Sequence, residues 1–257
     1  MNTATMTKRK ARTIGVVYFL FFPASIVSDR LLSGLIVQND AAATANHILA
    51  HESLFRAGVA MALVNTALYL ALTALFYELF KPVNRWVSFV AAFFGLVGCT
   101  IQAGGSVFEL FSLVVLQSPP GTSVLNAEQL PGLALLFLKL NDQAVLVALV
   151  FFAVYCLLIG YLILRSTFLP RFLGALMVLA GFGWLTFLYE PLANHFSPYI
   201  QVLGVAAEGL LMLWLLVMGV NAERWQEQAH TMDRYPENGH NRVVTVDKSR
   251  LNSSPGQ

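Results

Sequence analysis

Two acidic residues inside apolar stretches are the first candidates for chemistry in this sequence. Glu109 and Glu208 each lie within a long run of hydrophobic residues. A charged side chain at the centre of a bilayer costs at least about 2.5 kcal/mol, so such an acid needs a partner, a water-filled cavity or a proton. We therefore take both acids as candidate ligand-binding residues.

Small and polar residues accompany these acids at helical spacing. Residues three and four positions apart share one face of an α-helix. Three such faces are predicted, and all three should look toward the interior of a helix bundle. They consist of Gly95, Cys99, Gln102, Ser106 and Glu109; of Asn65, Tyr69 and Thr73; and of Gln201, Gly204 and Glu208.

Two interpretations of these faces remain open. In the first, they only pack helices together, with interhelical hydrogen bonds worth about 0.6 kcal/mol each, and Arg56 or Arg30 neutralises an acid. In the second, they line a polar cavity on the outer side that binds a cation, a proton or a polar headgroup. The charge count favours the second interpretation. The residues predicted to lie toward the outer side of the membrane include eight acids but only three bases, so not every acid can be paired. The predicted ligand-binding residues are Gln102, Glu109, Asp142, Glu190 and Glu208.

Three histidines form a weaker candidate metal site. His47 and His51 are four residues apart and could share a helical face, and His195 also falls on the predicted outer side. Imidazoles in this arrangement can bind a divalent metal when a third ligand is present. The pair lacks the internal Glu of a metalloprotease motif, and an exposed pair of histidines is also common without a metal.

No motif in the sequence predicts catalysis. A nucleophile elbow, a phosphate-binding loop and a dinucleotide fingerprint are all missing, so we predict no catalytic residues and no cofactor. Cys99 and Cys156 lie in apolar stretches without metal-binding spacing, and we interpret them as packing residues.

The elements that carry these residues are predicted to be membrane-spanning helices. Hydrophobic residues make up 57% of the 257 positions and charged residues only 12%, whereas soluble domains carry about 25% charged residues. A spanning helix needs roughly 20 mostly apolar residues. The sequence therefore predicts an all-α fold, a polytopic bundle of six transmembrane helices at residues 13–37, 55–79, 86–116, 143–164, 172–189 and 200–220.

The basic residues predict the orientation of this bundle. Thirteen of the 16 Lys and Arg residues fall before the first stretch, after the last, or in every second gap between. By the positive-inside rule, both termini lie in the cytoplasm and the protein resides in the cytoplasmic membrane. A secretory signal peptide is the alternative interpretation of the basic start, although no convincing cleavage site follows it. The net charge of +2 gives no case for nucleic-acid binding.

The segments outside the spans have their own predicted roles. Asp40 precedes three alanines, which predicts a capped interfacial helix within residues 39–54. Residues 133–140 are too short to cross and either dip into the interface or extend the fourth helix outward. The composition predicts three regions: a basic cytoplasmic N-terminus at 1–12, a membrane domain at 13–220, and a polar tail at 221–257 that begins as helix and is largely disordered.

Several separated motifs, in order, resemble one known family. The chain is similar to the bacterial integral membrane family described as domain of unknown function 4386, and the resemblance spans residues 12–220. It implies an integral membrane protein with several helices, no assigned activity and no catalytic residues. The motifs are RTIGVVY (12–18), DAAATA (40–45), ESLFR (52–56), KPVNR (81–85), GYLILRS (160–166), LPR (169–171), Gly174 and AGFGW (180–184).

The leading functional hypothesis is a binding or accessory membrane protein that holds a small ligand or lipid headgroup in a polar cavity on the outer side. A proton-linked transporter of a small solute is the second, because intramembrane acids suit proton relays. An intramembrane enzyme acting on lipid is the third. A transporter predicts a midplane site reachable from both sides, a binding protein predicts a pocket closed inward, and an enzyme predicts a nucleophile or metal beside an acid.

Overall fold

The described chain is helical throughout. The computed structural model describes residues 3–118, 126 and 128–234, and within them the secondary structure consists of helices without strands. The helices are α1 (Thr3–Ser33), α2 (Ala41–Ala50), α3 (Glu52–Phe80), α4 (Arg85–Leu116), α5 (Leu130–Arg165), α6 (Arg171–Leu185), the 3-10 helix η1 (Thr186–Leu188), α7 (Glu190–Val217) and α8 (Ala222–Arg234).

Six helical segments in the described residues are long and apolar enough to cross a bilayer. They correspond one to one with the six stretches predicted from the sequence, so the all-α, six-span fold is confirmed. Their bounds are Arg9–Ser33, Glu52–Phe80, Arg85–Leu116, Leu130–Arg165, Arg171–Leu188 and His195–Val217.

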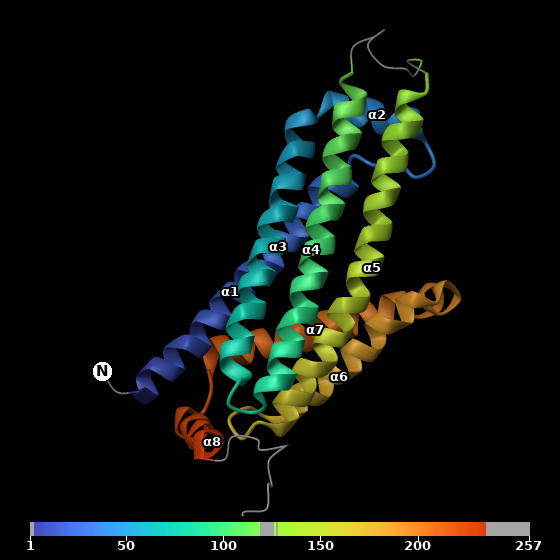
Figure 1. Cartoon of the computed structure of the whole chain (residues 1–257). Helices are drawn as coiled ribbons and strands as arrows, with labels where there is room; N and C mark the ends of the chain where they lie inside the picture. Colours follow the sequence, from blue (N-terminus) through green and yellow to red (C-terminus); the bar gives the residue numbers. More distant parts are fainter. Residues whose placement is uncertain (1–2, 119–125, 127, 235–257) are drawn as a thin grey trace, which may run out of the picture.

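The six spans form a ring in chain order. Helix α1 contacts α3, and each of α3, α4, α5 and α6 contacts the helix that follows it. Helix α7 returns to contact α1 and closes the ring. The long helices α3, α4 and α5 stand side by side, while α7 runs behind them (Figure 1). Residues from all six spans can therefore face one interior.

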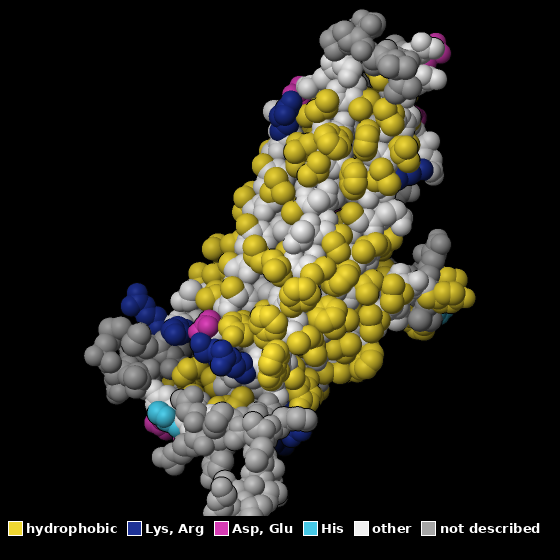
Figure 2. All heavy atoms as spheres, viewed as in Figure 1, with side chains coloured by type: hydrophobic (Ala, Val, Ile, Leu, Met, Phe, Trp, Pro, Cys, Tyr) yellow, Lys and Arg dark blue, Asp and Glu magenta, His cyan; other side chains and the backbone are white. Residues whose placement is uncertain are grey.

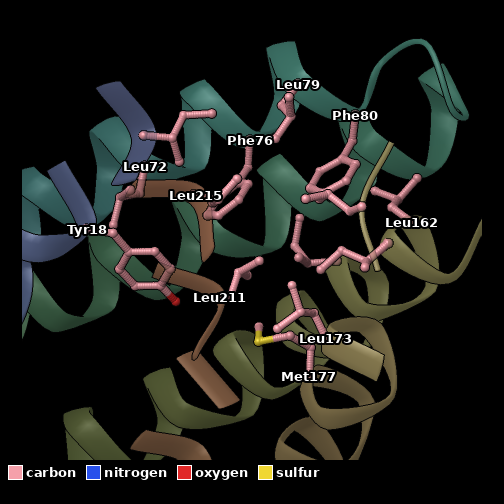
Figure 3. Packing of buried hydrophobic residues seen from close by; sticks show 14 of the residues in the cluster. Tyr18, Leu72, Phe76, Leu79, Phe80, Leu162, Leu173, Met177, Leu211 and Leu215 are labelled. Atoms are coloured by element: carbon pink, nitrogen blue, oxygen red, sulfur yellow. The ribbon is translucent and has the colours of Figure 1, made fainter. Parts of the chain in front are cut away.

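Two hydrophobic clusters fill this interior. The larger one includes Tyr18, Phe76, Phe80, Leu162 and Leu211, which come from α1, α3, α5 and α7 and are shown with their neighbours in Figure 3. The smaller one joins the loop after α1 to α2, α3, α4 and α5 through Leu35, Ile48, Phe55, Val59, Leu113 and Leu138. Most of the bundle is thus packed in two separate apolar layers along its length.

Helix α5 is longer than a bilayer requires. It runs unbroken for 36 residues, about 54 Å at a rise of about 1.5 Å per residue. Pro131 lies in its first turn, where the missing backbone N–H costs nothing. Residues 133–140 therefore extend this helix beyond the predicted span, as one of the two alternatives left open by the sequence had it, while the outward direction of the extension stays a prediction. The extension packs against α2.

The predicted cap of the short helix is also confirmed. The Asp40 Oδ1 accepts a hydrogen bond from the Ala43 backbone N–H at 2.9 Å, at the start of α2. Thr44 ties this helix to the preceding loop, because its hydroxyl bonds both the N–H and the carbonyl of Val37, at 3.0 and 3.1 Å. The location of α2 at a membrane interface stays a prediction.

Helices α5 and α6 approach each other through glycines. A Cβ placed on Gly160 would lie 2.8 Å from the Gly174 carbonyl oxygen, and a Cβ on Gly174 would lie 2.8 Å from the Gly160 carbonyl oxygen. Small residues allow this close approach of the two backbones. The resulting van der Waals contacts help to hold the helices together, because the hydrophobic effect does not drive helix association within lipid.

The described ends of the chain lie at one end of the bundle. The start of α1 and the helix α8 are both near the loops that join α3 to α4 and α5 to α6, as an even number of spans requires (Figure 1). Gly219, with a φ of +69°, ends α7, and the Trp225 indole N–H then bonds the Leu79 carbonyl at 2.9 Å to hold α8. The helical start predicted for the tail is present, and residues 235–257 lie outside the described structure.

The surface in Figure 2 supports the membrane assignment. Hydrophobic side chains cover most of the visible face between the two ends, and Lys and Arg side chains gather mainly at the end that carries α8, with smaller groups toward the other end. Exposed side chains such as Phe93, Phe111 and Leu179 are 46 to 56% accessible and lie on spanning helices, where lipid would cover them. Which end faces the cytoplasm stays a prediction.

Candidate functional site: a cavity inside the helix ring

Two of the three polar faces predicted from helical spacing look inward. Asn65, Tyr69 and Thr73 of α3 are buried, as are Ser106 and Glu109 of α4. On α7 the prediction holds only in part, because Gly204 is buried and Glu208 is partly buried, whereas Gln201 is exposed. Burial leaves open which of these faces bind a ligand and which only pack.

A cavity of about 330 Å³ lies between the helices, lined by all six spans, and it opens at the surface beside the Ile26 and Val205 side chains, which are 60% and 58% exposed. Its polar groups are the Glu208 carboxyl, the Gln102 carboxamide, the Ser25 and Tyr69 hydroxyls and the Trp184 indole. This volume falls within the range of about 300–1,000 Å³ found for small-molecule sites. The remaining lining residues are Phe21, Phe22, Ile26, Val145, Ala148, Leu149, Phe152, Gly204 and Val205.

Aromatic rings dominate the cavity wall. The Tyr69 ring lies 5.1 Å from the Phe21 ring and 4.9 Å from the Phe152 ring, measured between centroids. Phe22 and Trp184 complete a set of five aromatic side chains contributed by α1, α3, α5 and α6. The faces of such rings carry partial negative charge and attract cations.

A glycine on α7 makes room for one of these rings. A Cβ placed on Gly204 would collide with the Trp184 ring, so the indole packs directly against the α7 backbone. Glu208 follows one helical turn later on the same face of α7. The indole and the carboxyl thereby reach the same cavity.

Glu208 is held near the middle of its span among phenols and a thiol. It lies 13 residues after His195 and nine before Val217, in the span His195–Val217. The Tyr18 phenol of α1, the Tyr69 and Tyr155 phenols and the Cys156 thiol lie in its neighbourhood. Among the described residues, no base forms an ion pair with it.

Glu109 has a different environment. Its Oε1 accepts a hydrogen bond from the Asn141 side-chain N–H of α5 at 3.1 Å, while its buried Oε2 has no hydrogen-bond partner among the described residues. Gly105 leaves room for Asn141, since a Cβ there would lie 2.6 Å from its Oδ1. Glu109 lies about 10 Å beyond Gln102 along α4, at about 1.5 Å per residue. It is not among the residues that line the cavity.

The structure thus separates the five predicted ligand-binding residues. Gln102 and Glu208 line one cavity, whereas Asp142 is exposed on α5 next to Asn141. Glu190 begins α7, and its side chain lies outside the described structure. Ligand binding by any of them stays a prediction.

Arg56, one of the two arginines suggested as partners for an intramembrane acid, pairs elsewhere. The Arg56 Nε lies 2.7 Å from the Glu52 Oε1, one helical turn away on α3. A second guanidinium nitrogen of Arg56 donates to the Gln117 Oε1 at 3.4 Å. Arg56 therefore does not neutralise Glu109 or Glu208 in this structure.

The three candidate metal-binding histidines are not brought together. His47 lies on α2, the His51 ring Nδ1 lies 3.2 Å from the His47 backbone carbonyl oxygen, and His195 lies on α7 against Phe196. No group of three or more His, Cys, Asp or Glu side chains arranged to hold a metal occurs in the described part of the chain. The metal site remains an untested prediction.

Sequence reasoning missed the aromatic wall of the cavity. Phe21, Phe22 and Phe152 are ordinary residues of apolar spans, and no spacing rule distinguishes a ring that faces a cavity from one that faces lipid. The motif that ends in Trp184 offered one signal, because a tryptophan among glycines indicates a large ring packed against a close backbone.

Separate environments predict that Glu109 and Glu208 act independently. We expect the stability effects of Glu109→Gln and Glu208→Gln to add within about 0.5 kcal/mol, because residues without shared partners rarely couple by more. Each change removes the charge and keeps the shape. Thermal unfolding in detergent from pH 5 to 9 would measure the two single variants and the double variant beside the unaltered protein. A coupling larger than that limit would instead support one shared site.

A comparison of sequences assigns the chain to a family. Residues 13–219 match the family described as "Domain of unknown function (DUF4386)", which covers most of the 257 residues. The chain belongs to this family, as its motifs indicated. The description of the family assigns it no activity.

A relative matches part of the chain. A protein of Archaeoglobus fulgidus described as "Uncharacterized protein" is 33% identical over 73 residues, which are 27% of this chain and 43% of the relative. The match therefore spans less than half the length of that relative. No solved structure matches the chain.

Proposed function

We propose that this membrane protein binds a small lipophilic cation in the cavity inside its helix ring. The main support for this proposal is the composition of the cavity wall. The cavity, of about 330 Å³, is lined by five aromatic rings and by a single acidic residue, Glu208. Aromatic faces and a carboxylate are the groups that recognise an ammonium in an apolar site. Apolar walls would hold the rest of the molecule.

The volume limits the size of the ligand. About 330 Å³ holds a small molecule or one headgroup but not the acyl chains of a phospholipid. The Gln102 carboxamide and the Ser25 hydroxyl add hydrogen-bonding groups that would orient the ligand. A small amphipathic amine fits these features better than a whole lipid.

We expect benzyltrimethylammonium to bind the purified protein in lipid nanodiscs and to lose at least about tenfold in affinity with Glu208→Gln. The reason is that the variant removes the carboxylate whose negative charge attracts the ammonium, and a tenfold loss of affinity corresponds to about 1.4 kcal/mol. Isothermal titration calorimetry provides the measurement. Neopentylbenzene, which has the same shape without the charge, should bind the unaltered protein and the variant equally.

Glu109→Gln is the matched control, because it removes another intramembrane acid that does not line the cavity. It should leave the affinity for benzyltrimethylammonium unchanged. Equal affinities in the unaltered protein and in Glu208→Gln, or no binding at all, would rule out the proposed cation site. A loss with Glu109→Gln alone would move the site to the Asn141 region.

Proton-linked transport of such a solute is the second candidate function. The position of Glu208 near the middle of its span favours it, because intramembrane acids serve as proton relays. Uptake of the labelled cation into proteoliposomes with an imposed pH gradient would distinguish the two. A binding protein gives saturable binding without accumulation, whereas a transporter accumulates the cation and loses accumulation with Glu208→Gln.

A further inference from the structure

A second pocket lies away from the cavity, at the end of the bundle that carries most of the basic residues. It has a volume of about 900 Å³ and lies between the α3–α4 loop, the α5–α6 loop and α8. We term it the basic pocket. It is lined by Pro82, Val83, Arg165, Ser166, Thr167, Leu169, Arg171, Arg224, Glu227, Gln228, Thr231 and Met232.

Positive charge dominates the basic pocket. Three arginines, Arg165, Arg171 and Arg224, face a single acid, Glu227, among its lining residues. None of the three forms an ion pair with an acid in the described part of the chain. A planar guanidinium offers paired donors that match phosphate oxygens.

Hydrogen bonds hold the walls of the basic pocket in place. The Gln228 Oε1 accepts bonds from the Thr167 backbone N–H at 3.2 Å and from its hydroxyl at 3.1 Å. The Arg224 side chain donates to the Thr167 carbonyl at 3.4 Å. The Arg165 guanidinium lies 5.7 Å from the centre of the Tyr161 ring, which orients it. The loop and α8 therefore form one fixed wall, and Arg171 keeps its donors unused among the described contacts.

A groove adjoins the basic pocket at the end of α7. This hollow of about 520 Å³ shares Thr167, Leu169 and Arg224 with the pocket and is also lined by the apolar Trp214 and Met218, beside the polar Asn221 and Glu223. Met218 is 63% exposed, at the end of a spanning helix. The arginines of the basic pocket match the phosphate of a phospholipid, and the neighbouring Trp214 and Met218 side chains match its acyl chain.

We infer that the basic pocket binds an anionic phosphate group, supplied by the headgroup of a membrane phospholipid whose acyl chain lies along the groove of Trp214 and Met218. Basic pockets between the cytoplasmic ends of membrane helices bind anionic headgroups in this way. The same chemistry would also recognise a free phosphate. The site is separate from the cavity of the proposed function and does not depend on it.

The test compares lipid retention in native mass spectrometry. The protein would be purified with an equal mixture of phosphatidylglycerol and phosphatidylcholine. We expect the unaltered protein to retain phosphatidylglycerol preferentially, and the double variant Arg165→Gln/Arg171→Gln to lose at least about fivefold in retention for each arginine removed. The double variant keeps the bond between Arg224 and Thr167, so the fold of this wall is preserved.

Two further arms make the outcome decisive. Arg30→Gln removes a positive charge near the far end of α1 and should leave lipid retention unchanged. Inorganic phosphate is the probe for a soluble source, measured by thermal shift. If phosphate stabilises the unaltered protein but not the double variant, and phosphatidylglycerol shows no preference, the phosphate site stands and its lipid source is rejected. If neither probe depends on the arginines, the inference is overturned.

Discussion

Alkaline phosphatase fused after Asn126 or Asn194 is expected to be active, and the same enzyme fused after Asn84 or Ser166 is expected to be inactive. The enzyme forms its disulfides only outside the cytoplasm, so its activity reports the side of the membrane. The expected effect is all-or-none. It follows from 13 of the 16 basic residues falling in alternate gaps and at the two termini.

The structure agrees with the grouping of fusion sites in this topology test. The α3–α4 and α5–α6 loops lie at the same end of the bundle as the start of α1 and α8 (Figure 1). A cytoplasmic fluorescent reporter at the same four positions should give the reverse pattern and serves as the control. A uniformly reversed pattern would contradict the orientation, and a broken alternation would contradict the six-span arrangement.

Phe80→Ala is expected to lower the free energy of unfolding by about 3–5 kcal/mol. The Phe80 ring is fully buried at the end of α3, near Phe76 (Figure 3). It stacks with the Phe76 and Phe168 rings, at centroid distances of 5.9 and 6.0 Å. Removing it leaves a void between α3 and the α5–α6 loop that the neighbours fill only in part. Unfolding in mixed detergent micelles would measure the loss.

Phe89→Ala is the matched control for this prediction. Phe89 lies on α4 with 52% of its surface exposed, where lipid would surround it. Truncating it should change the free energy of unfolding by no more than about 0.5 kcal/mol. Similar losses of unfolding free energy for both variants would contradict the prediction, because they would mean that Phe80 contributes no more to stability than a lipid-facing side chain does.

The local sequence determined the elements of this protein and their inward faces. Six apolar runs of sufficient length predicted six spans, and intervals of three and four residues placed Tyr69, Ser106 and Glu109 inside. Asp40 before Ala41 predicted the start of α2. These features depend on residues close in the chain, because helical periodicity and capping act within a few turns.

The tertiary structure alone decided how the inward faces meet. Three features depend on how helices that are distant in sequence pack together. They are the contact of α7 with α1, the separation of Glu109 from the cavity, and the aromatic wall formed by Phe21, Phe152 and Trp184. The sequence predicted that both acids lie on inward faces. It did not predict that they lie at different depths and contact different partners. Spacing along a helix fixes a face, whereas packing between helices fixes which faces share a cavity.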